Sequence, residues 1–172
     1  MMIFPEYCVT MARYNAWQNK QLRAAFDTLS EAELRKERKA FFGSIFSTAN
    51  HLLWGDMIWM SRFDGGARPE AGISDSVDLT PTPAVWAGDR YRMDARILRW
   101  AEGLNAIDLK GDLRWYSGAL GCDMVKSIDL CITHFFNHQT HHRGQIHAML
   151  TAAGATAPVT DLFIMPEDGP WL

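Results

Sequence analysis

The chain has 172 residues, a length that suits one domain with its own hydrophobic core. Apolar residues make up 48% and charged residues 22%, which is ordinary for a globular protein, and the formal net charge is −3. This balance argues against a nucleic-acid-binding protein, whose phosphate-binding surface would make the domain basic. The three cysteines form no C-x-x-C pair, which argues against a disulfide framework or a cysteine zinc cage.

The start of the chain has no charged and apolar regions of the kind that make up a secretory signal. No stretch approaches the roughly eighteen apolar residues of a membrane span. We therefore expect a cytoplasmic protein that binds neither membrane nor nucleic acid.

The first half of the chain predicts two long helices. Apolar residues at 3–4 spacing indicate a helix from Pro5 to about Thr28. The sequence from Ser30 to Glu33 matches a capping box, which predicts a short extra helical turn. A second long helix is expected from about Ser44 to Phe63, and it is apolar on most sides, as a central bundle helix would be.

The second half predicts two more helices with irregular connections. The breaker-rich stretch 64–81 is expected to be either a functional lid or a disordered crossover. Thr82-Pro83 is typical of a helix start, and glycines between Ile107 and Cys122 indicate a short hairpin. The last helix is expected from about Met124 to Ala153, ended by Gly154. Residues 1–172 are thus predicted to form one all-α domain, a four-helix bundle with a long crossover loop and a short β-hairpin before the last helix.

Five of the six histidines lie on the last predicted helix, within residues 134–147. At about 100° per residue, His138 and His142 both face the apolar stripe and lie one turn apart, close enough to share a metal ion. His134 and His141 fall at the edge of the stripe, and His147 points toward solvent.

A third ligand is available from the second helix, where His51 is the one histidine in an apolar sequence. A buried imidazole is costly unless its ring nitrogens have partners, and neutral imidazole suits Zn, Ni, Fe or Cu. Three such ligands would leave coordination positions open for water or substrate, as in catalytic sites.

The competing interpretation is that these histidines only make hydrogen bonds, in the core or at the surface. An i,i+4 histidine pair is weak evidence without the H-E-x-x-H pattern, and Gln139 stands where that pattern has glutamate. Spacing alone leaves both interpretations open.

The run HFFNHQTHHRGQI, from His134 to Ile146, closely resembles the N-H-x-x-x-H-R-G-Q-I signature of the DinB/YfiT-like proteins. The segments 14–22 (YNAWQNKQL) and 49–52 (ANHL) with Asp56 are similar to the family's first and second helices. The resemblance covers essentially the whole chain in the right order.

This resemblance implies a homodimeric four-helix bundle in which His51, His138 and His142 hold a divalent metal, with Zn, Ni or Fe as candidates. It also implies that Gly144 permits close helix approach and that Arg143 and Gln145 line or brace the site. Characterised relatives include transferases and isomerases that use small thiols such as bacillithiol, mycothiol or glutathione.

The expected function is therefore a metal-dependent enzyme whose tri-histidine site activates a low-molecular-weight thiol or water toward a small electrophilic molecule. The crossover, Trp54 and Trp115 would shape the substrate pocket. Asp56 lies roughly 140° around the helix from His51, so it is given no catalytic role, and catalytic and thiol-binding residues are left unassigned. The alternatives are a non-catalytic, dimeric metal-binding or stress-response bundle, and a metal-free bundle with hydrogen-bonded histidines.

Overall fold

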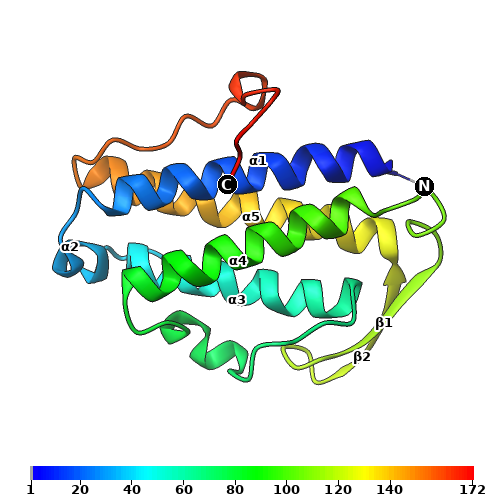
Figure 1. Ribbon diagram of the computed structural model, residues 1–172. Helices are drawn as coiled ribbons and strands as arrows, with labels where there is room; N and C mark the ends of the chain where they lie inside the picture. The colour runs from blue at the N-terminus through cyan, green and yellow to red at the C-terminus, as the bar shows by residue number, and fades with distance from the viewer. Residues whose placement is uncertain (1) are drawn as a thin grey trace.

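The computed structural model describes residues 2–172, in which four long helices pack lengthwise (Figure 1). These are α1 (Pro5–Phe26), α3 (Ile45–Phe63), α4 (Pro83–Glu102) and α5 (Ile128–Ala152). Each of α1 and α3 contacts both α4 and α5, so the four helices close into a ring around one core. The prediction of a four-helix bundle with a hairpin before the last helix is confirmed.

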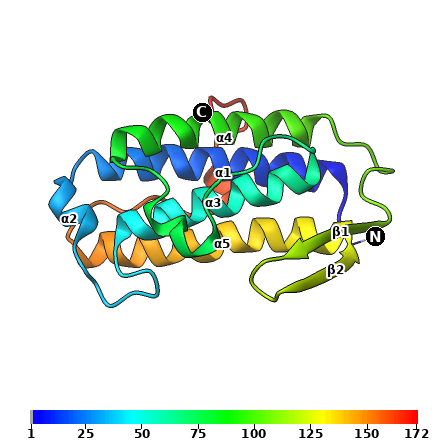
Figure 2. The same ribbon diagram turned by 90° about the horizontal axis from the view of Figure 1, so that it is seen from below.

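The long connection between α3 and α4 follows from their direction, because the two helices run the same way along the bundle (Figures 1 and 2). The chain must therefore return the length of α3, and it does so through the short 3-10 helix η1 (Ile73–Asp78). The Asn50 side chain donates to the Val77 carbonyl at 3.0 Å, and the Trp54 indole donates to the Ala71 carbonyl at 2.8 Å. The crossover is thus ordered, and these two hydrogen bonds hold it against α3.

Three helices begin at the capping residues that the sequence indicates. Ser30 accepts a hydrogen bond from a backbone N–H of the short helix α2 (Glu31–Arg35) at 3.2 Å. Ser44 caps α3 and Thr82 caps α4 in the same way, at 3.0 and 3.3 Å. Each side-chain oxygen satisfies a backbone N–H that the first turn of a helix leaves without a partner.

The start of α5 differs from the prediction. Strands β1 (Asp112–Ser117) and β2 (Cys122–Ser127) form an antiparallel hairpin, and the helix begins only at Ile128. Met124 and Val125 were expected in the helix, but both pair with β1. The apolar spacing that links Val125 to the helix stripe is coincidental, because Val125 is 43% exposed rather than buried.

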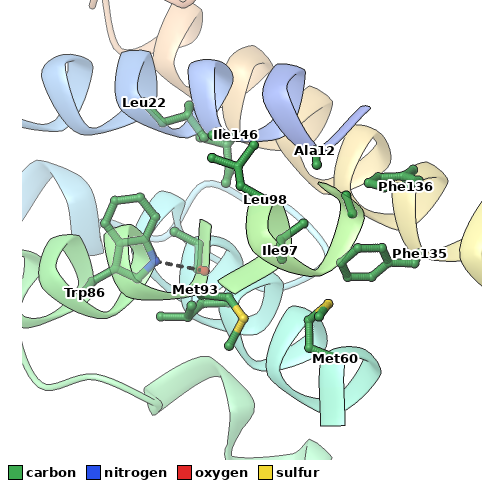
Figure 3. Packing of buried hydrophobic residues seen from close by; sticks show 14 of the residues in the cluster. Ala12, Leu22, Met60, Trp86, Met93, Ile97, Leu98, Phe135, Phe136 and Ile146 are labelled. Carbon is green, nitrogen blue, oxygen red and sulfur yellow. Dashed lines mark hydrogen bonds between the residues drawn. The ribbon is translucent and has the colours of Figure 1, made fainter. Parts of the chain in front are cut away.

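The apolar stripes of all four helices meet in a single core (Figure 3). Leu22 from α1, Trp86 from α4 and Phe135 from α5 are almost completely buried in it. The Trp86 indole donates to the Ala49 carbonyl of α3 at 3.1 Å, so this large side chain is buried without an unpaired donor. Within residues 2–172, none of the helices is long and apolar enough to cross a membrane.

A buried polar network also lies between the helices and is centred on Arg90 of α4. Its guanidinium contacts the Asp56 carboxylate of α3 at 2.6 Å and the Asp94 carboxylate at 2.8 Å. Asn19 of α1 donates to Asp94 at 2.9 Å, and Gln139 of α5 donates to Asp56 at 3.0 Å. Every long helix therefore contributes a side chain to this network.

A second buried guanidinium balances the charge of the network. Arg143 of α5 donates to the Asn15 side-chain oxygen, and the Asn15 amide donates to Asp94 at 3.1 Å. Two arginines thus accompany two carboxylates. Burial raises the pKa of Asp94 to about 6 and lowers that of Arg143 to about 10, while the opposite charges nearby favour the ionised forms.

Arg90→Ala should lower the free energy of unfolding by about 3–5 kcal/mol, because it leaves two buried carboxylates without their cation. Arg92→Ala, on the same helix but exposed and paired only with Asp89, should change it by less than about 1 kcal/mol. Urea denaturation of the two variants measures both values. Equal losses for the two variants would contradict the role given to Arg90.

Candidate metal centre

The structure brings His51 of α3 together with His138 and His142 of α5. One ring nitrogen from each lies within 4.8 Å of those of the other two, and within residues 2–172 these histidines are the one cluster with such spacing. The Nε2 atoms of His138 and His142 are 3.0 Å apart. His51 and His142 are buried, and His138 is half-buried. The three residues selected from the sequence thus converge, and their binding of a metal stays a prediction.

The crossover fixes which nitrogen of His51 is free to bind. His51 Nδ1 lies 2.9 Å from the Ser76 hydroxyl oxygen, and that hydroxyl donates its own hydrogen to the Ile73 carbonyl at 2.7 Å. Because the single hydroxyl hydrogen is already used, His51 Nδ1 must carry the hydrogen and donate it to Ser76. The Nε2 atom of His51 therefore presents a lone pair, as a metal ligand requires.

His142 is held in the same tautomer by its own helix. Its Nδ1 donates to the Gln145 side-chain carbonyl at 2.8 Å, which leaves the Nε2 lone pair directed at His138. In the absence of a cation, the close contact between the two Nε2 atoms requires a proton on His138. The Nδ1 atom of His138 is then buried without a hydrogen-bond partner.

A glycine of α3 makes room for the His138 ring. A Cβ atom at Gly55 would lie 2.8 Å from Cε1 of His138, which is closer than carbon atoms can approach. Glycine inside a helix costs roughly 1 kcal/mol relative to alanine, so its presence here has a packing reason. Gly55, rather than Gly144, permits the close approach of α3 and α5.

Aromatic side chains cover the imidazoles. The Phe42 ring stacks on His51 with centroids 4.0 Å apart and also lies 5.5 Å from His142. Trp54 stacks on His51 at 5.9 Å while its indole holds the crossover. These contacts fix the orientation of the His51 ring and limit its access to water.

Burial keeps all three imidazoles in their neutral form. It lowers the pKa of His51 to about 4 and that of His138 to about 3, and the neighbouring imidazoles lower both pKa values further. The pKa of His142 is also lowered, mainly by burial. Neutral imidazole is the form that binds a metal, so no proton needs to be removed at pH 7.

The remaining histidines of α5 stay outside the cluster, as the helical count indicated. His134 is exposed and lies between Trp59 and His138, with ring centroids 5.1 and 5.8 Å away. His141 is exposed beside His142. His147 was expected in solvent but is half-buried, because the C-terminal tail passes over this end of α5.

Two further expectations about neighbouring residues need correction. A Cβ atom at Gly144 would meet nothing within 4 Å, so this glycine does not serve helix packing. Trp115 lies on the hairpin and packs against Trp59 and Arg62 rather than against His51. Gln145 braces His142 as expected, whereas Arg143 belongs to the buried polar network.

The site fits a divalent metal on its own geometry. Two nitrogens bound tetrahedrally at about 2.0–2.1 Å lie roughly 3.3 Å apart, close to the separation of the two Nε2 atoms on α5. His51 and His142 direct lone pairs inward, and His138 would offer its Nε2 lone pair in the tautomer that carries the hydrogen on Nδ1, so that its imidazole stays neutral. This donor set of three neutral nitrogens suits Zn, Ni or Fe.

Ser76→Ala should weaken metal binding about 10–100-fold, because His51 loses the acceptor that fixes its tautomer and orientation. Ser61→Ala, near the C-terminal end of α3, removes a hydroxyl that bonds only to its own helix and should leave the affinity unchanged. Competition titration with a chromophoric chelator measures the metal affinity of each variant. Unchanged affinity in Ser76→Ala would remove Ser76 from the site.

His138 should make the metal-free protein less stable at acid pH. Unfolded histidine has a pKa of about 6.5, so below that pH the unfolded chain binds a proton that the folded His138 does not. The stability of the wild type relative to His138→Gln should therefore fall as the pH is lowered from 7 to 4. Other groups, including Asp94, titrate in both proteins, so their contributions cancel in the difference between the two unfolding free energies. A difference in unfolding free energy that is constant with pH would contradict the burial of a neutral imidazole.

Comparison with known proteins agrees with this fold. A model of the DinB family matches residues 2–169. Protein DinB of Bacillus subtilis (strain 168) is 26% identical over 163 residues, which cover 91% of each chain. A solved DinB-like protein from Bacillus cereus ATCC 10987 has a TM-score of 0.63 and 16% identity, covering 83% of this chain and 90% of that one, and supports the fold alone. With a family match over nearly its whole length, this chain belongs to the DinB family.

Proposed function

We propose that this protein is a metal-dependent enzyme in which His51, His138 and His142 hold a divalent cation. One observation carries the proposal: three neutral imidazoles from two helices converge, two with their tautomers fixed so that Nε2 is free. Because each of these two imidazoles uses its Nδ1 hydrogen in a bond to the protein, its Nε2 lone pair is left for a partner inside the cluster.

When bound, the cation would lower the pKa of a low-molecular-weight thiol or a water molecule that reaches it, which prepares that molecule to attack a small electrophile. The chain itself supplies three nitrogen ligands and no carboxylate or thiolate. This leaves coordination positions for the reacting molecules, as in catalytic rather than structural sites. Ser76 and Gln145 hold two of the ligands in place.

The chain also offers these molecules a route to the site. An open pocket of about 740 Å³ borders His51 and His142, and a shallower one borders His138. Phe42 stacks over His51 and keeps water from one side of the ring. Binding and orientation of the substrate beside the histidines is the contribution that this geometry supports.

One observation favours the alternative of a non-catalytic metal-binding bundle. Asp56 is the carboxylate nearest in sequence to His51 on α3, but it is buried and engaged by Arg90 and Gln139. It is therefore not free to move a proton for a reaction. A catalytic role would depend on the Lewis acidity that a metal held by the three histidines would supply, and on groups of the substrate.

Protein purified without a histidine tag should contain about one divalent ion per chain. His51→Ala, His138→Ala and His142→Ala should each lose most of it, because two remaining imidazoles hold a cation weakly. His147→Ala, on the same helix but outside the cluster, should retain the metal. Elemental analysis of the four variants gives the result, and full metal content in His138→Ala and His142→Ala would refute the site.

Catalysis is tested separately with a panel of small thiols and electrophiles, assayed with the metal-loaded and the metal-free protein. We expect turnover that requires both the metal and His51. Metal binding without turnover across the panel would favour the non-catalytic alternative.

A further inference from the structure

The pocket beside His51 and His142 has a wall built from four parts of the chain. Its volume of about 740 Å³ lies in the usual range of small-molecule sites. The loop before α3, α3 itself, the crossover and α5 each supply part of the wall, through Phe41, Phe42, His51, Ile73, Ser74, His141, His142 and Gln145. A molecule in this pocket would touch the imidazoles directly.

Two phenylalanines occupy the tip of a tight turn at the pocket's edge. The N–H of Gly43 donates to the carbonyl of Ala40 at 2.9 Å, so Phe41 and Phe42 are the two central residues of the turn. Gly43 has a φ of 77°, a conformation that glycine adopts without strain. Turn tips usually carry Gly, Pro, Asn, Asp or Ser, so two aromatic residues here are unusual.

The apolar part of the pocket faces solvent rather than the core. Phe41 is 83% exposed, and Ile73 of the crossover, which also lines the pocket, is 50% exposed. Single exposed apolar residues are common, but a group of them around a concave site indicates a surface that a ligand covers. The Phe41 and Phe42 rings meet edge to face at 4.8 Å, an arrangement into which a further ring can pack.

The wall carries no carboxylate, ammonium or guanidinium group. Beside the imidazoles, its polar side chains are a serine and a glutamine, which can fix orientation but do not balance a charge. Away from the metal, a charged group would lose water there without gaining a partner of opposite charge. An uncharged ligand with an apolar ring would gain from the same transfer.

We propose that this pocket binds the uncharged aromatic portion of the small molecule that reaches the metal centre, with its ring against Phe41 and Ile73. The proposal rests on the proposed function, since it names the chemical class that the same site selects. A donor atom at one end of the molecule would approach the three histidines. The aromatic ring would lie on the side formed by the turn and the crossover.

The test compares two neutral probes, 4-phenylimidazole and imidazole, each titrated into the cobalt-loaded protein and followed by the visible absorption of cobalt. We expect 4-phenylimidazole to bind roughly 10–100-fold more tightly, because its phenyl ring leaves water. Phe41→Ala should reduce this preference several-fold. Phe163→Ala, an equally exposed phenylalanine on the C-terminal tail (87%), is the matched control and should leave it unchanged.

Equal affinities, or a preference that Phe41→Ala leaves intact, would overturn the inference. In the metal-free protein, where a carboxylate has no cation to coordinate, imidazole-4-acetate binding as tightly as 4-phenylimidazole would overturn it too. Sedimentation is run in parallel, and a dimer that Phe41→Ala dissociates would show that a second copy covers the patch instead.

The same probes are also titrated into metal-free protein by NMR, with the Ile73 methyl signals as the readout. A preference for 4-phenylimidazole there, together with failure to take up cobalt, would overturn the proposed function and leave the pocket assignment standing. Loss of the preference in both forms, with normal cobalt uptake, would overturn the pocket assignment alone.

Discussion

The contact of the buried Arg90 guanidinium with Asp56 and Asp94 is the interaction on which the arrangement of this bundle depends. A charge without access to water is tolerated only with partners of opposite charge, so the three side chains must meet whenever the helices pack. Asp56 in turn accepts from Gln139, which lies between His138 and His142 in the α5 sequence. The register that satisfies this bond also brings the two α5 histidines opposite His51.

The bundle therefore contains two neighbouring polar layers that differ in one respect. In the Arg90 layer, two arginines and two carboxylates neutralise one another, and every long helix contributes a partner. In the histidine layer, no charges oppose one another, and ring nitrogens from three neutral imidazoles converge. The charges of the first layer balance without any added group, whereas the imidazole nitrogens of the second would bind a cation. This difference is why the metal centre is assigned to the histidines.

The sequence was sufficient for the parts of the fold and site that depend on helical periodicity. The i,i+4 pair His138 and His142 and the lone His51 were identified in this way and through the DinB resemblance. The supporting residues were not, because their roles depend on tertiary contacts. Ser76 comes from a crossover with no periodicity, and the pairing of Arg90 needs Asp56 of another helix. Gly55 left a detectable signal, a glycine inside an otherwise apolar helix. The start of α5 was misplaced because strand residues continued the apolar spacing by chance.

The central claim is that three histidines bind one divalent metal through the atoms that the surrounding hydrogen bonds leave free. Diffraction from crystals of the metal-loaded protein, recorded at the absorption edge of the metal, tests it most directly. The account predicts one anomalous peak about 2.0–2.1 Å from Nε2 of His51, His138 and His142, with at least one further ligand that is not protein. A peak bound by other residues, or by fewer than these three histidines, would contradict it.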